Sequence, residues 1–192
     1  MVLIIAIISV AVMTMDNKAF GQILTSGTLN GHEWVDLGLP SGTKWATCNV
    51  GASAPKRCGG YYEYEKEVIG DAGYEHWEGW QVPTEDQLHE LRYKCKWIPA
   101  STGAKVVGPN GNSIFLPFAG ASWKSYNDDG TYTWREPSSV MEYGYYWCIG
   151  YYLKINIKET SNYEEYIYDM YYSSENEKRR IKASLRLVVE SD

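Results

Sequence analysis

The chain of 192 residues is 44% hydrophobic, which suits a single domain of ordinary size with a full core. Its net charge of −6, with Lys178–Arg180 as the only basic block, argues against nucleic-acid binding, because such binding depends on neutralising many phosphates. The 17 Tyr and 8 Trp against 3 Phe favour aromatic side chains with a polar end, which suit a recognition surface.

The N-terminal segment from Met1 to Met13 is apolar, but it is too short for a membrane span, which needs about 20 residues. It is typical of the hydrophobic part of a signal peptide, and the small residues Ala19 and Gly21 predict cleavage before Gln22. Because no Lys or Arg precedes the apolar run, an uncleaved membrane-proximal helix is the alternative.

These features predict the organisation of the whole chain. We expect a signal peptide at residues 1–21, a linker at 22–30 and a single domain at 31–190. Cleavage predicts an extracellular or cell-surface protein with no stable membrane span.

Short segments of the strand type dominate the domain; they are rich in aromatic or β-branched residues and bounded by Gly, Pro or Asn. We expect such strands at residues 34–37, 43–48, 113–116 and 145–148. Alternating apolar and polar residues predict two half-buried strands, at 151–157 and 185–189. The connections between strands are long and show little regular pattern, as at residues 120–142.

One helix is predicted to begin after Thr84, which can form a capping box with Gln87. Three residues then fall on one face of this helix: Leu88, Leu91 and Cys95. The carboxylates of Glu85 and Asp86 suit the positive end of the helix dipole. We therefore attribute the acidic set of Glu85, Asp86 and Glu90 to the helix start and not to acid–base catalysis.

The segment LPSGTKWATCNVG reads as a turn, one core strand carrying Trp45, and a second turn. Gly42 and Gly51 supply backbone freedom that other residues lack. Lys44 and Asn49 are expected at solvated strand positions, with ligand contact as the alternative. The segment is therefore interpreted as structural.

The four cysteines, Cys48, Cys58, Cys95 and Cys148, form no C-x-x-C pair, and the three histidines show no H-x-x-x-H spacing. We therefore expect no metal and no cofactor. An exported chain allows disulfides, so the cysteines are interpreted as disulfides or as buried thiols.

Seven motifs, in order, carry a resemblance to a known family: Gly31–Ala52, Tyr61–Tyr62, Trp80–Glu85, Cys95–Trp97, Gly108–Pro117, Gly144–Trp147 and Ser184–Val188. Over residues 31 to 190 the chain strongly resembles the Fibrobacter succinogenes major paralogous domain, found in secreted or surface proteins of gut Bacteroidetes-type bacteria. The resemblance implies an α+β, C-type-lectin-like fold with short antiparallel strands, one or two helices and long loops. It implies a fold and a location, since the family has no settled activity.

The resemblance also sorts the cysteines. Cys48 and Cys95 belong to family motifs, whereas Cys58 and Cys148 stand where the family usually has other residues. Two additions in one chain imply a Cys58–Cys148 disulfide, worth about 4 kcal/mol in the chain-entropy estimate. Four buried thiols are the alternative.

Two sharper functional interpretations fit the residues poorly. Val82–Glu85 resembles a helix start of formylglycine-generating enzymes, but those enzymes need a closely spaced cysteine pair that holds copper, and this chain has none. A calcium-dependent lectin would use Glu136–Ser138 and Asn127–Gly130, but both matches are imperfect and the second reads as an ordinary turn. We therefore expect a protein that is not an enzyme.

The expected function is a non-catalytic binding or adhesion domain whose partner is an extracellular glycan or protein. A structural subunit of a surface polymer is the first alternative, and an enzyme related to formylglycine-generating enzymes is the second. Aromatic residues among polar ones provide the candidate ligand-binding residues: Trp123, Tyr132, Trp134, Tyr168 and Tyr171. The first three are expected to be partly exposed on one face.

Overall fold

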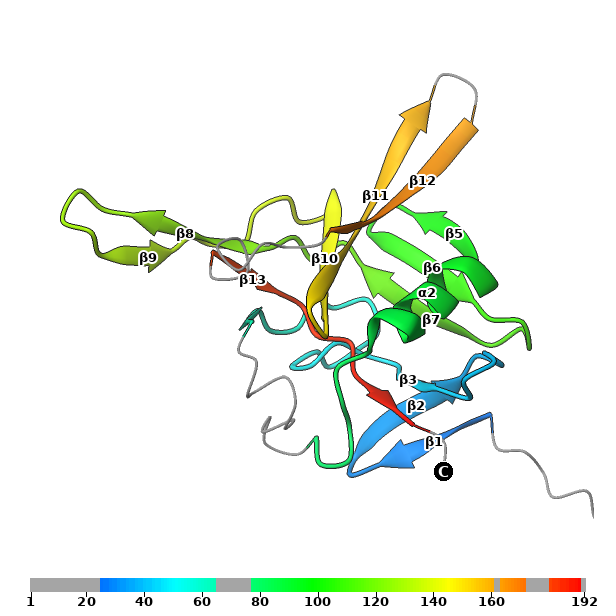
Figure 1. Cartoon of the computed structure of the whole chain (residues 1–192). Coiled ribbons are helices and arrows are strands. Elements are labelled where there is room, and N and C mark those ends of the chain that lie inside the picture. The colour runs from blue at the N-terminus through cyan, green and yellow to red at the C-terminus, as the bar shows by residue number, and fades with distance from the viewer. Residues whose placement is uncertain (1–24, 65–76, 161–162, 172–179, 191–192) are drawn as a thin grey trace, which may run out of the picture.

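The computed structural model describes residues 25–64, 77–160, 163–171 and 180–190. In these ranges the chain forms four antiparallel sheets and one short helix, a mainly β arrangement that agrees with the expected α+β class (Figure 1). The predicted signal peptide at 1–21 and residues 22–24 of the predicted linker lie outside the described residues.

The first sheet joins the N-terminal strands to the C-terminal one, in the order β1-β2-β3-β14. Its strands are β1 (Ser26–Leu29), β2 (His32–Asp36), β3 (Lys44–Ala46) and β14 (Val188–Val189). Asn30 and Gly31 both have positive φ, as a two-residue hairpin turn between β1 and β2 requires. Gly42 and Gly51 also have positive φ, which confirms the turns expected on either side of Trp45.

Helix α2 (Glu85–Lys94) is capped as predicted. The Thr84 hydroxyl accepts from the Gln87 backbone N–H at 3.3 Å, and Gln87 Oε1 accepts from the Thr84 N–H at 2.8 Å. Glu90 accepts a hydrogen bond from the Ser41 hydroxyl at 2.6 Å, so it ties α2 to the turn before β3. This contact gives Glu90 a structural role.

The helix packs beside a second sheet, ordered β5-β6-β7 (Figure 1). Its strands are β5 (Lys96–Ala100), β6 (Gly103–Val107) and β7 (Ser113–Pro117). Leu88 and Leu91 of the helix join Trp97, Val106 and Leu116 of this sheet in the first core cluster. Burial of the apolar helix face drives this packing.

A third sheet consists of β10 (Tyr143–Cys148), β11 (Tyr151–Thr160) and β12 (Tyr163–Tyr171). β10 is buried on both faces, because Tyr146 and Cys148 enter the first core cluster whereas Tyr145 and Trp147 enter a second one. β11 and β12 continue as a two-stranded ribbon that projects from the body (Figure 1).

The fourth sheet has the order β4-β13-β8-β9 and includes a second projecting hairpin, formed by β8 and β9 (Figure 1). Its strands are β4 (Tyr62–Glu63), β13 (Ile181–Ala183), β8 (Ser122–Tyr126) and β9 (Tyr132–Trp134). The expectation of an irregular connection at residues 120–142 is therefore wrong in part, because β8 and β9 lie within it. Short segments that contain aromatic residues lie on both sides of the turn residues Asn127–Gly130, and that pattern produces a hairpin.

Arg186 lies at the centre of the fold and is 1% exposed. Its guanidinium donates to the carbonyl oxygens of Ala46 and Thr47 at 3.0 and 2.8 Å, and to that of Phe115 at 2.9 Å. It also donates to Asn49 Oδ1 at 2.9 Å. Burial lowers the pKa of this guanidinium, and four of its five N–H groups find acceptors.

This network corrects two expectations. The strand expected at 185–189 is not continuous, because β13 ends at Ala183 and β14 begins at Val188, with the buried Arg186 between them. Asn49 is fully buried instead of solvated, since it accepts from Arg186 and donates to the Cys58 carbonyl at 2.8 Å. Neither role is visible in a local pattern, because every partner is distant in the sequence.

Candidate functional site

One face of the β4-β13-β8-β9 sheet gathers aromatic and charged side chains, and we call it the hairpin face. Strand pairing places Lys124 opposite Trp134, and Tyr126 opposite Tyr132. Because directly paired residues in a sheet share a face, these four lie on the same side. The neighbouring strands add Glu63 and Lys182, which are also paired, and Arg180 stands immediately before β13: the hairpin face is Glu63, Lys124, Tyr126, Tyr132, Trp134, Arg180 and Lys182.

The cations of the hairpin face lie over its rings. Lys124 Nζ is 4.0 Å from the centre of the Tyr132 ring and 5.0 Å from that of Trp134. Lys182 Nζ is 4.4 Å from the Trp134 ring centre, and the Arg180 guanidinium carbon is 5.4 Å from that of Tyr126. The rings also contact each other, with Tyr132 and Trp134 edge to face at 6.1 Å. Each cation is held in place by an aromatic neighbour.

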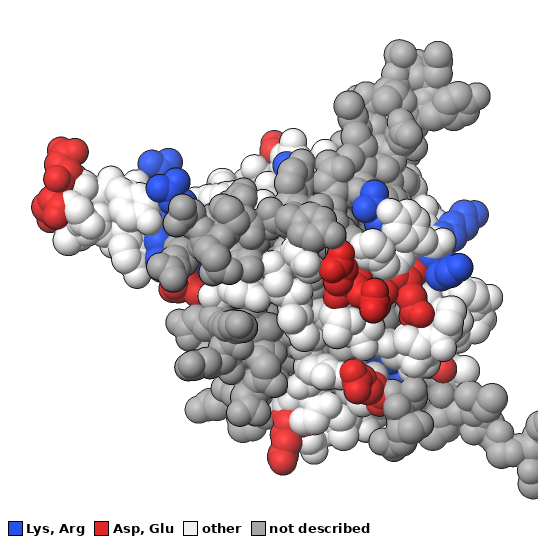
Figure 2. All heavy atoms as spheres, in the orientation of Figure 1, with Lys and Arg blue, Asp and Glu red and all other residues white. Residues whose placement is uncertain are grey.

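Positive charge exceeds negative charge on this face among the described residues. Glu63 is shared by two cations, with Lys182 Nζ 3.3 Å from one carboxylate oxygen and Lys124 Nζ 3.9 Å from the other. Figure 2 shows Lys and Arg atoms along the β8–β9 hairpin and acidic atoms at its tip. The face is therefore a local cationic area on a protein of net charge −6.

The aromatic residues of the face differ in exposure. Tyr126 and Tyr132 are 54% and 47% exposed, and Trp134 is half-buried. Large aromatic side chains usually become covered on folding, so two half-exposed tyrosines side by side form a surface suited to a partner. Tyr126 and Tyr132 contact each other at 6.1 Å between ring centres, which makes the exposed surface continuous.

The structure brings together two of the three aromatic residues expected to share a face. Tyr132 and Trp134 belong to the hairpin face, but Trp123 points to the opposite side, where its ring meets that of Tyr145 edge-on at 6.1 Å. All three are at least partly exposed, and the expectation that they share one face is wrong. The physical reason is the alternation of side chains along β8, which separates Trp123 from Lys124.

The other two predicted residues lie in β12, where Tyr168 pairs with Ile155 and Tyr171 with Tyr152. Their side chains lie outside the described part of the structure. Sequence reasoning missed Lys124 and Tyr126. Their two-residue spacing just before the turn was a usable signal, because it places both on one face of a strand. Sequence reasoning also missed Glu63, Arg180 and Lys182, for which no local signal exists.

The polar side chains of the turn at the tip of the hairpin form hydrogen bonds with one another. The Thr131 hydroxyl and N–H donate to Asp129 Oδ1 at 2.6 and 2.9 Å, and these hydrogen bonds lower the pKa of that carboxyl. Asn127 Nδ2 donates to the Thr131 hydroxyl at 2.8 Å. The described residues include no group of three or more side chains arranged to hold a metal ion.

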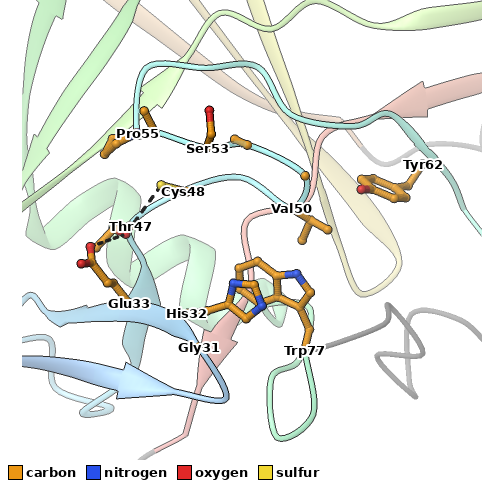
Figure 3. A pocket seen from close by; sticks show the side chains of 13 residues that line it. Gly31, His32, Glu33, Thr47, Cys48, Val50, Ser53, Pro55, Tyr62 and Trp77 are labelled. Carbon is orange, nitrogen blue, oxygen red and sulfur yellow. Dashed lines mark hydrogen bonds between the residues drawn. The ribbon is translucent and has the colours of Figure 1, made fainter.

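A cleft of about 760 Å³ lies elsewhere, between the first turn and the segment after β3 (Figure 3). His32 and Trp77 stack on one side of it, with ring centres 3.5 Å apart, and Cys48 and Ser53 lie on the other side. Within the described residues no hydrogen bond joins His32 to Cys48, so the cleft holds no thiol–imidazole pair of the kind that activates a nucleophile.

All four cysteines are free thiols in the structure, so the predicted Cys58–Cys148 disulfide is not formed. Cys148 is fully buried in the first core cluster, whereas Cys58 lies beside Asn49 and Tyr61. Burial and the neighbouring Cys58 raise the pKa of Tyr61 to about 12. The resemblance to the family pattern therefore did not predict which cysteines are paired.

Comparisons with protein-family models, curated proteins and solved structures find no match to this chain. The hairpin face is therefore interpreted from its own geometry. In the described ranges, no helix is both long enough and apolar enough to cross a membrane.

Proposed function

We propose that this chain is a secreted or cell-surface binding domain without catalytic activity, that its fold is C-type-lectin-like, and that the hairpin face binds a glycan. One observation carries the proposal: Tyr126, Tyr132 and Trp134 form a continuous aromatic surface on a hairpin that projects from the body (Figure 1). Rings of this kind stack against the C–H faces of sugars, and their polar ends hydrogen-bond to hydroxyl groups.

The position of this surface supports the proposal. It is built on a short sheet anchored to the core, because Ile181 of β13 is fully buried and pairs with Trp123 of β8. A rigid scaffold that presents an exposed loop or hairpin is a frequent arrangement for binding sites. The extracellular location rests on the N-terminal apolar segment and on the resemblance of residues 31 to 190 to a family of secreted and surface proteins.

A glycan array probed with the full chain, with and without calcium, tests the proposal. We expect binding to a defined set of glycans and its loss in Tyr126→Ala and Tyr132→Ala. Tyr93→Ala is the matched control, because Tyr93 is 64% exposed but lies on α2, away from the hairpin face. Loss of binding in Tyr93→Ala but not in the two hairpin variants would contradict the assignment of the site. Binding to proteins but to no glycan would contradict the ligand class.

A second candidate function, a subunit of a surface polymer, is favoured by the projecting ribbon. β12 has 9 residues, and within the described residues it pairs with β11 on one side and with no strand on the other. Such an edge can pair with another chain. Light scattering over a range of concentrations tests this function: ordered growth would support it, and a monomer at every concentration would contradict it.

A further inference from the structure

We propose that the hairpin face selects an acidic saccharide, with a sugar carboxylate held by Lys124, Arg180 and Lys182 and the sugar ring stacked on Tyr126 and Tyr132. This inference rests on the proposed function and specifies its ligand class. The occupant is a chain of uronic acid residues, each with one carboxylate and one stacking face.

Charge complementarity is the first argument. The face presents three cations and one carboxylate among the described residues, on a protein whose net charge is −6. The negative charge of the whole molecule therefore repels anions in general. Only an anionic ligand that fits the hairpin face gains from the positive charge there. A neutral glycan would gain nothing from the excess positive charge of the face.

The environment of Lys124 is the second argument. Its side chain is only 11% exposed, and its Nζ lies 3.9 Å from Glu63 Oε2, which is longer than a hydrogen bond. The rings of Tyr132 and Trp134 fix its position. A cation that is already partly desolvated and ordered loses little solvation and entropy on binding, so it binds a carboxylate more strongly than a mobile surface lysine does.

The tip of the hairpin is the third argument, because it limits how densely charged a ligand on the hairpin face can be. Asp128 and Asp129 are exposed at the end of the β8–β9 hairpin, where Figure 2 shows acidic atoms beyond the basic ones. A densely charged polyanion lying along the hairpin would meet these carboxylates and be repelled. A uronic acid chain carries one charge per sugar, so one carboxylate can occupy the cationic area while the next residues avoid the tip.

Calorimetric titration of the full chain compares four probes: oligogalacturonate, the same oligosaccharide with its carboxylates methyl-esterified, heparin, and single-stranded DNA. We expect oligogalacturonate to bind at least about tenfold more tightly than the ester, because the ester keeps the stacking faces and loses the charges. We expect this preference to fall with added salt.

Variants separate the role of charge from that of folding. Lys124→Gln and Lys182→Gln should reduce the affinity for oligogalacturonate to that for the ester, whereas Lys124→Arg should keep the preference. Lys105→Gln is the matched control, because Lys105 is exposed on β6, outside the hairpin face. Circular dichroism of each variant should match that of the unchanged chain.

The outcomes distinguish this inference from the function on which it rests. Equal binding of oligogalacturonate and its ester would overturn the acidic ligand and leave the glycan-binding function intact. Binding of heparin or DNA as tight as that of oligogalacturonate would overturn the inference in favour of attraction to any polyanion. Binding of none of the four probes, together with an empty glycan array, would overturn both.

Discussion

Trp123 and Tyr132 belong to the same hairpin but point to opposite faces of it. The Trp123 ring packs against Tyr145 at the second core cluster, whereas Tyr132 lies half-exposed beneath the Lys124 ammonium. One hairpin therefore provides a hydrophobic anchor on one side and a candidate binding surface on the other.

Because the two rings lie on opposite faces, replacing each by Ala should have a different effect on stability. Trp123→Ala should lower the free energy of unfolding by about 2 kcal/mol or more, because it removes a large ring from the cluster edge. Tyr132→Ala should change it by less than about 0.5 kcal/mol, since the ring is half-exposed. Urea unfolding measures both. Equal losses would show that the two faces do not differ in structural importance.

Arg186→Met should be among the most destabilising single changes in the chain. It leaves Asn49 Oδ1 and the carbonyl oxygens of Ala46, Thr47 and Phe115 without their buried donor. We expect a loss of about 3 kcal/mol or more in the free energy of unfolding. Arg57→Met is the control, because Arg57 is exposed, and it should change stability by less than about 0.5 kcal/mol. A similar small loss for Arg186→Met would contradict the central role of the network.

Stability should fall in alkaline solution through the titration of Cys95. Burial, and then the nearby charge of Glu90, raise the pKa of this thiol from 9.0 to about 11. The folded state therefore keeps its proton while the unfolded state loses it, so the contribution is complete below pH 9.0 and is lost as pH rises to about 11. Cys95→Ala should reduce the fall in unfolding free energy over this range.

The same variant provides its own reference at pH 7, where the thiol is protonated in both states and the change in stability reports packing alone. An unchanged slope between pH 9.0 and 11 in Cys95→Ala would show that another group causes the alkaline loss.

The cysteines should all react as free thiols. When the purified chain is unfolded and alkylated without reductant, peptide mapping should find label on Cys48, Cys58, Cys95 and Cys148, as expected from the structure. In the folded chain Cys148 should react slowest, because it is fully buried. Recovery of a Cys58–Cys148 cross-linked peptide would restore the disulfide that the sequence suggested.

Local features of this protein were determined by its sequence alone. The capping box of Thr84 and Gln87 and the turns at Gly42 and Gly51 involve residues within one turn of each other. Such features depend on backbone conformation and nearby hydrogen bonds, so the amino-acid pattern contains them. The buried strand positions of Trp45 and Leu116 also follow from apolar runs bounded by turn residues.

Only the tertiary structure decided which side of the hairpin each aromatic residue takes and which cations accompany it. The register of β13 against β8 turns Trp123 inward, and its register against β4 sets Lys182 beside Glu63, although these residues are far apart in the chain. Arg186 was likewise placed in the core by acceptors from two separate segments, residues 46–49 and Phe115. Long-range pairing leaves no local signature, because the free energy that selects it comes from packing and hydrogen bonds formed when the sheets assemble.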